Sequence, residues 1–286
     1  PPRSTLFPYT TLFRSLGFYG DPNVKTPHLD ELAKKSIVFE NAISSCPVCS
    51  PARASLLTGQ HPLTHGVFLN DVHLQNKGES IADAFGAAGY DTAYIGKWHV
   101  DGKGCRSAYI PKERRQGFQY WKVLECTHEY NRSFYYDDEP VKKQWEGYDT
   151  LAQTRDAANY ILNHHQNKPF FLVVSWGTPH EPYHTAPEKY RALYARKKLR
   201  LRPNVPWRFH RRARKDLLGY YSHITAIDEC IATIETAINT KGIQDNTLLV
   251  FWSDHGDMLY CHGLQKKQKP WEESIQIGRA SCRERV

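Results

Sequence analysis

The sequence feature that most limits the fold is a regular alternation of helix-like and strand-like segments. Apolar residues at helical spacing mark residues 26–35, 80–88, 150–165 and 216–240, and strand-like apolar runs mark residues 37–39, 92–95, 169–176 and 247–253. This alternation predicts an α/β fold with a predominantly parallel sheet sandwiched by helices. The runs 169–176 and 247–253 are largely apolar, which is typical of strands buried on both faces.

Polar residues follow three of the strand-like runs. Gly-Lys-Trp-His at 96–99 follows the run at 92–95, Thr-Pro-His-Glu-Pro at 178–182 follows the run at 169–176, and Asp-His-Gly at 254–256 follows the run at 247–253. Each cluster alone has an ordinary turn composition. Ligands bind outside the carboxyl ends of parallel strands, so we expect the three clusters to form one site.

A fourth segment supplies a candidate nucleophile. Cys49-Ser50-Pro51-Ala52-Arg53 is followed by Leu-Thr-Gly at 57–59, and we expect a helix to begin around Pro51, because proline is tolerated in the first turn. Cys46 and Cys49 could instead be half of a zinc site or a redox Cys-x-x-Cys motif. Zinc needs a second ligand pair at comparable spacing, which the other cysteines do not offer. A redox pair should itself open the helix after a strand.

The segment around Cys49 resembles the Cys-x-Pro-x-Arg signature of the formylglycine-dependent sulfatases, a family of the alkaline-phosphatase-like superfamily. Residues 16–20, 26–30, 96–99 and 253–257 resemble further segments of the family in the same order. The resemblance implies a sulfuric ester hydrolase that cleaves a sulfate monoester, with a sulfated carbohydrate as substrate. An iduronate-sulfatase-like branch and a bacterial polysaccharide-sulfatase branch are the nearest in pattern.

The resemblance also implies the catalytic groups, which are Cys49, Arg53, Lys97, His99, His180 and Lys267. Cys49 would be oxidised to formylglycine by a formylglycine-generating or anaerobic sulfatase-maturing enzyme, and Arg53 would orient it. We expect His180 to protonate the departing alcohol and His99 to take the proton from the hemiacetal, because imidazole titrates near neutrality. Lys266 and Lys269 are near neighbours of Lys267 and are alternatives to it.

The implied metal is calcium, with the residue derived from Cys49, Asp254 and His255 facing the ion. His255 stands where the family more often has asparagine. The family also supplies a pair of aspartates at the end of the first strand, where this chain has Thr10 and Thr11. Calcium affinity depends on the number of carboxylates, so we expect the chain as it stands to bind calcium poorly, and to be poorly folded or inactive.

The two ends of the chain are related to each other at the level of DNA. One DNA string can encode residues 5–15, and its reverse complement encodes residues 277–286. We interpret residues 1–15 and 277–286 as adapter-derived, non-native segments, and residues 16–276 as part of a sulfatase catalytic domain. We therefore expect the first strand and a C-terminal part of the fold to be missing, which would leave unpaired backbone groups in the sheet.

The formal net charge is +8, part of which comes from arginines in the two end segments. The remaining modest excess suits an anionic substrate. A basic stretch from Arg196 to Lys215 either forms a track for a polysulfated chain, with Trp207 and Phe209 stacking on sugars, or is a solvated loop before the helix expected at 216–240. No recognised module predicts nucleic-acid binding, and no run is long and apolar enough to span a membrane.

Two other function classes stay open. A phosphonate or phosphate monoester hydrolase of the same superfamily could use the same nucleophile and metal. An inactive polysaccharide-binding relative is the second alternative, although it would leave Cys49, Arg53, Lys97 and His180 together unexplained. The seven cysteines have no regular spacing and predict no disulfide framework.

Overall fold

The computed structural model describes residues 4–10, 15–104, 108–165, 167–277 and 279–281, with backbone alone for 4–10 and 279–281. The strands of the main sheet are β1 (Ser4–Thr10), β2 (Ile37–Phe39), β3 (Asp91–Lys97), β4 (Tyr120–Leu124), β7 (Phe170–Ser175), β8 (Thr247–Ser253) and β9 (Arg279–Ser281). A small second sheet contains β5 (Phe134–Tyr135) and β6 (Lys143–Gln144). The helices are α1 (Pro27–Lys34), α2 (Cys49–Thr58), α3 (Pro62–His65), α4 (Ile81–Ala87), α5 (Asp149–Asn163), α6 (Glu188–Arg191), α7 (His210–Lys241) and α8 (Glu272–Ile275).

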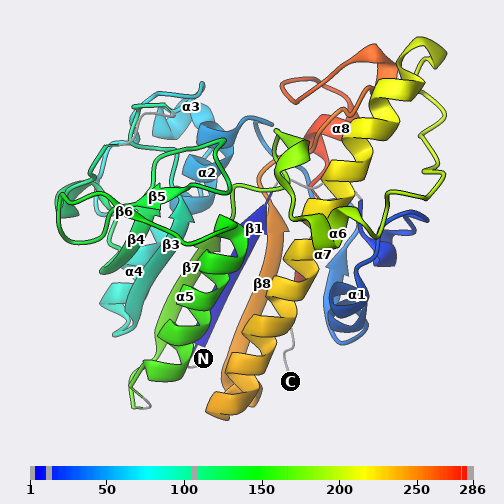
Figure 1. Cartoon of the computed structure of the whole chain (residues 1–286). Helices are drawn as coiled ribbons and strands as arrows, with labels where there is room; N and C mark the ends of the chain where they lie inside the picture. Colours follow the sequence, from blue (N-terminus) through cyan, green and yellow to red (C-terminus); the bar gives the residue numbers. More distant parts are fainter. Residues whose placement is uncertain (1–3, 11–14, 105–107, 166, 278, 282–286) are drawn as a thin grey trace.

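The main sheet has the strand order β2-β9-β8-β1-β7-β3-β4. The strands from β8 to β4 are parallel, and β9 pairs antiparallel with both β8 and β2. The carboxyl ends of the parallel strands therefore point to one edge of the sheet, which is the upper edge in Figure 1. The predicted α/β fold with a mainly parallel, helix-covered sheet is confirmed.

The side chains of β7 divide between two cores because successive residues of a strand point to opposite faces. Leu172 and Val174 pack with residues of α5 and α7, the two helices that cross the front of the sheet in Figure 1. Phe171 and Val173 pack with an aromatic cluster that includes Trp98. Every residue of β7 is buried, as the uninterrupted apolar run predicts.

The sequence predicted that the first strand is missing, but the structure has a strand, β1, at a central position of the sheet. β1 lies between β8 and β7 and pairs in parallel with both, with Thr10 in register with Ser253. Ladder hydrogen bonds use backbone groups, so the position accepts any segment that can be extended. The sequence of β1 is rich in residues that favour strands, apart from Pro8, which has no N–H to donate.

Among the elements that differ from the sequence-based expectation, two bear on the site. Helix α7 begins at His210 rather than near Asp216, so the end of the basic stretch is helical instead of forming a loop. Ala213 and Leu217 lie one helical turn apart on the buried side, which explains the earlier start. The second element, β4, was not predicted, because its residues 120–124 mix aromatic, charged and aliphatic side chains without an apolar run.

In the part of the chain that the structure describes, no helix is both long enough and apolar enough to cross a membrane.

A buried carboxyl group follows β4. Burial, together with the nearby charge of Asp101, raises the pKa of Glu125 from 4.5 to about 8. One carboxylate oxygen accepts a hydrogen bond from the backbone N–H of Asp101 at 2.9 Å, and the other has no hydrogen-bond partner among the described residues. The folded protein therefore favours the protonated form of Glu125.

This shift predicts a pH-dependent stability. The pKa of Glu125 is higher in the folded than in the unfolded protein, so ionisation of Glu125 destabilises the fold. The resulting loss of free energy of unfolding is negligible well below pH 4.5 and grows until the pH passes about 8. We expect Glu125→Gln to change the free energy of unfolding little at pH 4.5 and to raise it at pH 8.5 by about 4–5 kcal/mol, because one pKa unit corresponds to about 1.4 kcal/mol. Urea denaturation of both proteins at the two pH values measures this, and an equal effect at both would contradict it.

Candidate active site

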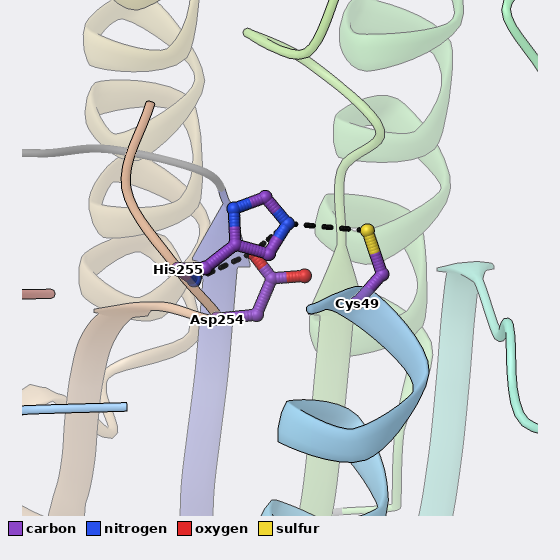
Figure 2. Close-up of side chains that lie close together, drawn as sticks. All are labelled: Cys49, Asp254 and His255. Atoms are coloured by element: carbon purple, nitrogen blue, oxygen red, sulfur yellow. Dashed lines mark hydrogen bonds and ion pairs between the residues drawn. The ribbon is translucent and has the colours of Figure 1, made fainter. Parts of the chain in front are cut away.

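Cys49 is the first residue of α2, at the sheet edge where the parallel strands end. The helix begins two residues earlier than expected, so Pro51 lies inside its first turn, where its missing N–H is tolerated. Val48 precedes the helix in an extended conformation and turns the chain into it. The Cys49 side chain is buried and faces Asp254 and His255 in Figure 2. A helix N-terminus favours negative charge on a thiol placed there.

His255 contacts Cys49 directly. Its Nε2 lies 3.1 Å from Cys49 Sγ, and its Nδ1 lies 2.8 Å from the carbonyl oxygen of Gly256. Because a carbonyl can only accept, Nδ1 carries a proton, and Nε2 is the nitrogen that faces the sulfur. The Asp254 carboxylate accepts a hydrogen bond from the His255 N–H at 3.0 Å, which fixes the turn after β8.

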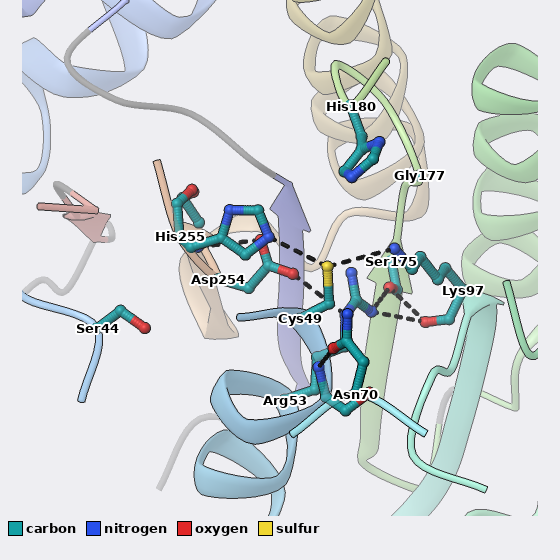
Figure 3. A network of polar contacts seen from close by, with 12 residues as sticks. Ser44, Cys49, Arg53, Asn70, Lys97, Ser175, Gly177, His180, Asp254 and His255 are labelled. Atoms are coloured by element: carbon teal, nitrogen blue, oxygen red, sulfur yellow. Dashed lines mark hydrogen bonds and ion pairs between the residues drawn. The ribbon is translucent and has the colours of Figure 1, made fainter. Parts of the chain in front are cut away.

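Arg53 joins α2 to the ends of three strands. Its guanidinium donates to the Lys97 carbonyl at 2.8 Å and to Ser175 Oγ at 2.7 Å, and its Nε lies 3.2 Å from Asp254 Oδ2. Ser175 Oγ in turn donates to the Lys97 carbonyl at 2.6 Å. Arg53 is almost completely buried. It holds the helix that carries Cys49 against β3, β7 and β8 (Figure 3).

Lys97 approaches Cys49 from the side opposite His255 (Figure 3), with its Nζ 3.7 Å from the sulfur. Burial acts to raise the pKa of the Cys49 thiol, but the charges of Lys97, Lys267 and His255 together bring that pKa well below its usual value. Burial acts to lower the pKa of Lys97, yet the negative charge of Cys49 raises it overall. The two groups therefore stabilise each other as thiolate and ammonium.

Gly96 lets Lys97 reach this position. Its φ of 108° lies in a region that other residues rarely adopt, and a Cβ there would lie 2.2 Å from the Ser175 carbonyl oxygen. The close approach of β3 and β7 at this point brings Lys97 and Ser175 side by side.

His180 and Lys267 form a second part of the site. Lys267 Nζ lies 2.5 Å from His180 Nε2, and His180 Nδ1 donates to the Glu181 carbonyl at 3.0 Å. Burial and the charges of Lys267 and Lys97 hold the pKa of His180 well below its usual value. His180 is therefore neutral here and accepts from the Lys267 ammonium.

Of the two alternatives to Lys267, Lys266 has its side chain engaged with another residue. Lys266 forms an ion pair with Glu181 at 2.7 Å, and the backbone N–H of Lys269 donates to Ser274. Of the three lysines, Lys267 is the one that reaches His180, and its charge acts on Cys49.

His99 lies apart from the cysteine. Its φ of 61° is left-handed, its Nε2 lies 3.8 Å from Asp71 Oδ1, and its Nδ1 is buried with no hydrogen-bond partner in the described part of the chain. The imidazole that contacts Cys49 is that of His255. The unpartnered Nδ1 of His99 remains available to a bound group.

Sequence analysis missed His128, which belongs to the same site. Its ring stacks on that of His180, with centroids 5.0 Å apart and an angle of 9° between the ring planes. Burial lowers the pKa of His128, and the charges of Lys97 and Lys267 lower it further. His128 follows β4, the strand that was not predicted. If β4 had been predicted, the rule that sites lie beyond strand ends would have indicated His128.

The residues present do not fit a calcium ion by themselves. Among the described residues, Cys49, Asp254 and His255 are the one group of three potential metal ligands that converges, with ligand atoms within 4.8 Å of one another. They offer one carboxylate, one imidazole and one sulfur, whereas calcium takes six to eight oxygen ligands. Cys46 is a free cysteine outside this group, so the arrangement does not support a Cys46–Cys49 zinc site either.

The family model described as Sulfatase matches residues 9–278. This chain belongs to the sulfatase family. An ulvan-active sulfatase of Formosa agariphila is 50% identical over 267 residues, which cover 92% of this chain and 52% of that protein. An endo-4-O-sulfatase of Bacteroides thetaiotaomicron is 32% identical, covering 92% of this chain and 58% of that protein. The chain thus spans a little over half the length of these relatives.

A solved structure from work on glycosaminoglycan metabolism by Bacteroides thetaiotaomicron has the same fold. It superposes with a TM-score of 0.91 at 30% identity, covering 99% of this sulfatase chain and 67% of the other. The fold is therefore that of the alkaline-phosphatase-like superfamily, as the resemblance implied.

The thiolate state of Cys49 can be tested on chain made without a maturing enzyme. We expect Lys97→Met to raise the pKa of Cys49, increasing its proton affinity roughly tenfold or more, because the nearest cation is removed. Ultraviolet absorbance of the thiolate, followed as a function of pH, measures this. Lys143→Met, at a lysine paired with Asp137 away from Cys49, is the control. An unchanged titration in Lys97→Met would contradict the electrostatic account.

Proposed function

We propose that this chain is the catalytic part of a carbohydrate sulfatase, which hydrolyses a sulfate monoester with formylglycine derived from Cys49. The observation that carries the proposal is the convergence of cationic side chains from separate segments on one buried sulfur. Lys97 lies 3.7 Å from it, and the charge of Lys267 also acts on it. The names of the two relatives support a sulfated polysaccharide as substrate.

The cations match the charge of the substrate. A sulfate ester carries a delocalised negative charge, which must be held while a nucleophile attacks sulfur. Lys97 and Lys267 would bind the sulfate oxygens, and preorganised cations of this kind contribute strongly to catalysis. Arg53 donates through Nε and Nη1 to Asp254, the Lys97 carbonyl and Ser175, so its proposed part is to position the nucleophile.

Oxidation of Cys49 by a maturing enzyme would supply an aldehyde whose hydrate has two hydroxyl groups on one carbon, one to attack sulfur and one to expel sulfate afterwards. The side chains around it would manage the protons. His255 Nε2 faces this position, so the neutral imidazole could accept a proton there. His99, with an unpartnered Nδ1, is the second candidate acceptor.

His180 is the proposed acid for the departing alcohol. In the structure it is neutral, because burial and two lysines oppose its protonation. A bound sulfate would offset the charge of those lysines and raise the pKa of His180, so the imidazole would gain its proton when substrate is present. For that, the Lys267 ammonium, which here donates to Nε2, would turn to the sulfate oxygens and leave Nε2 free to take the proton.

Calcium is proposed for a site more complete than the present one. Thr10 ends β1 in register with Ser253, the residue before Asp254, so a carboxylate at the end of β1 would lie near Asp254. Thr11, the second position where the family has aspartate, lies outside the described residues. We propose that this chain as it stands binds calcium too weakly for efficient turnover.

The double substitution Thr10→Asp with Thr11→Asp tests the calcium proposal. We expect calcium to raise the melting temperature of this variant but not of the unsubstituted chain, because binding to the folded state stabilises by about 2.7 kcal/mol at a hundredfold excess over Kd. Thermal denaturation with calcium, with magnesium and with chelator measures this. The proposal fails if calcium stabilises the unsubstituted chain equally.

Sulfate release tests the function itself. The aspartate-restored variant, coexpressed with a maturing enzyme, should release sulfate from a sulfated oligosaccharide and should be much slower on phosphate and phosphonate esters. In that background Cys49→Ser should accumulate covalently bound sulfate or give no turnover, since a single hydroxyl cannot expel the sulfate it has taken. Mass spectrometry and sulfate release measure the two results. Full turnover with Cys49→Ser would disprove the mechanism, and faster phosphonate hydrolysis would disprove the sulfatase assignment.

A further inference from the structure

A cleft of about 570 Å³ adjoins the reaction centre. His128, which stacks on His180, forms part of its wall, and so do Glu181 and Lys266, the chain neighbours of His180 and Lys267. The cleft therefore opens beside the groups proposed to contact the sulfate and the departing alcohol. Its volume lies within the range of about 300–1,000 Å³ that small-molecule sites occupy.

Helix α7 forms one wall of this cleft through residues at helical spacing. Arg212, Lys215, Asp216 and Gly219 all line it, at positions i, i+3, i+4 and i+7. Gly219 allows the opposite wall to approach, because a Cβ there would lie 2.1 Å from the carbonyl oxygen of Tyr183. The basic stretch of the sequence therefore delivers two of its cations to the cleft.

The acidic side chains of the cleft already have partners. Glu181 forms an ion pair with Lys266 at 2.7 Å, Asp216 accepts from the Tyr260 hydroxyl at 2.5 Å, and Asp257 accepts from the Tyr183 hydroxyl at 2.9 Å. Burial also raises the pKa of Asp257.

Unlike these acids, the two cations on α7 are not paired in the part of the chain that the structure describes. Neither Arg212 nor Lys215 has an ion-pair partner among the described residues, and both are exposed to solvent. The Arg212 guanidinium lies 5.9 Å from the centre of the Tyr260 ring, which helps to hold it over the cleft. Two uncompensated cations thus face a cavity that is open to ligand.

We propose that this cleft is a subsite for a second anionic group of the substrate, carried by the sugar next to the one that bears the scissile sulfate. Arg212 and Lys215 bind that group, which is either a uronate carboxylate or another sulfate. Tyr183 and Tyr260 contribute aromatic surface beside it. The inference rests on the proposed carbohydrate sulfatase function for its view of the substrate, but the binding of an anionic sugar can be measured without turnover.

The other aromatic residues of the basic stretch do not form this subsite. Phe209 packs against Val205, Ala213 and Met258, and its ring lies 5.6 Å from that of Tyr260. Trp207 is 85% exposed and does not line the cleft. Of the two alternatives weighed for the basic stretch, a track for an anionic chain is therefore limited to the cleft-facing side of α7.

Calorimetric titration with three tetrasaccharides tests the proposal. The probes are an unsulfated oligogalacturonate, its neutral methyl ester, and a sulfated oligogalactose without carboxylates. We expect the oligogalacturonate, the sulfated probe or both to bind, and the methyl ester not to bind. Arg212→Gln and Lys215→Gln should each weaken anionic binding roughly tenfold, since a hydrogen bond to a charged group contributes about 1.5–3 kcal/mol. The anionic probe that responds more strongly identifies which anion the subsite takes.

Arg211→Gln is the matched control, because Arg211 is exposed on α7 but does not line the cleft. It should bind both anionic probes as the unsubstituted chain does, and circular dichroism melting should show all variants folded. The proposal is overturned if the double variant Arg212→Gln with Lys215→Gln binds both anionic probes as tightly as Arg211→Gln, or if the methyl ester binds as well as the acid.

One further variant separates this subsite from the reaction centre. We expect Lys97→Met to bind the oligogalacturonate as the unsubstituted chain does. If Lys97→Met abolishes binding of this probe while the α7 variants do not, the anion occupies the reaction centre and the subsite is disproved. Failure of the proposed function gives a different pattern. In that case the aspartate-restored chain releases no sulfate, yet binding still depends on Arg212 and Lys215.

Discussion

The buried guanidinium of Arg53 is the interaction on which the site depends. A buried charge costs several kcal/mol unless it is paired and hydrogen-bonded, and Arg53 pairs with Asp254 and donates to Ser175 and the Lys97 carbonyl. These partners stand at the ends of β8, β7 and β3. One side chain therefore fixes the start of α2 against three strand ends, which places Cys49 where the polar clusters meet. Loss of this cation would leave Asp254 buried without its main partner.

Around this fixed point the charges are arranged in two zones. The first contains Cys49, His255 and Lys97, where a thiolate is stabilised by cations although it is buried. The second contains His180, Lys267 and His128, where two neutral imidazoles lie beside an ammonium group. The first zone suits a nucleophile and the second suits a departing oxygen that needs a proton. The cleft along α7 continues from the second zone, which is the side on which the alcohol part of a substrate would lie.

The position of β1 shows that a central strand of a parallel sheet needs little more than an extended backbone that can form ladder hydrogen bonds. β1 lies between β8 and β7 and pairs with both through its backbone, so the sheet is continuous across this position. Among the described residues, Asp254 is the one carboxylate that converges with Cys49 and His255. The strand position depends on ladder hydrogen bonds, whereas the proposed calcium site would depend on carboxylate side chains.

The sequence by itself determined the α/β class, the extents of β2 and β8, the order of the polar clusters, and Cys49 as the centre of the site. It could do so because hydrophobic periodicity and strand-end placement are local patterns. Tertiary structure alone decided which imidazole contacts the sulfur, which of three lysines reaches His180, and that His128 joins the site through an unpredicted strand. It also decided that α7 begins early enough to turn Arg212 and Lys215 into a cleft wall. These outcomes depend on distances between segments far apart in the chain, and local sequence patterns carry no information about such distances.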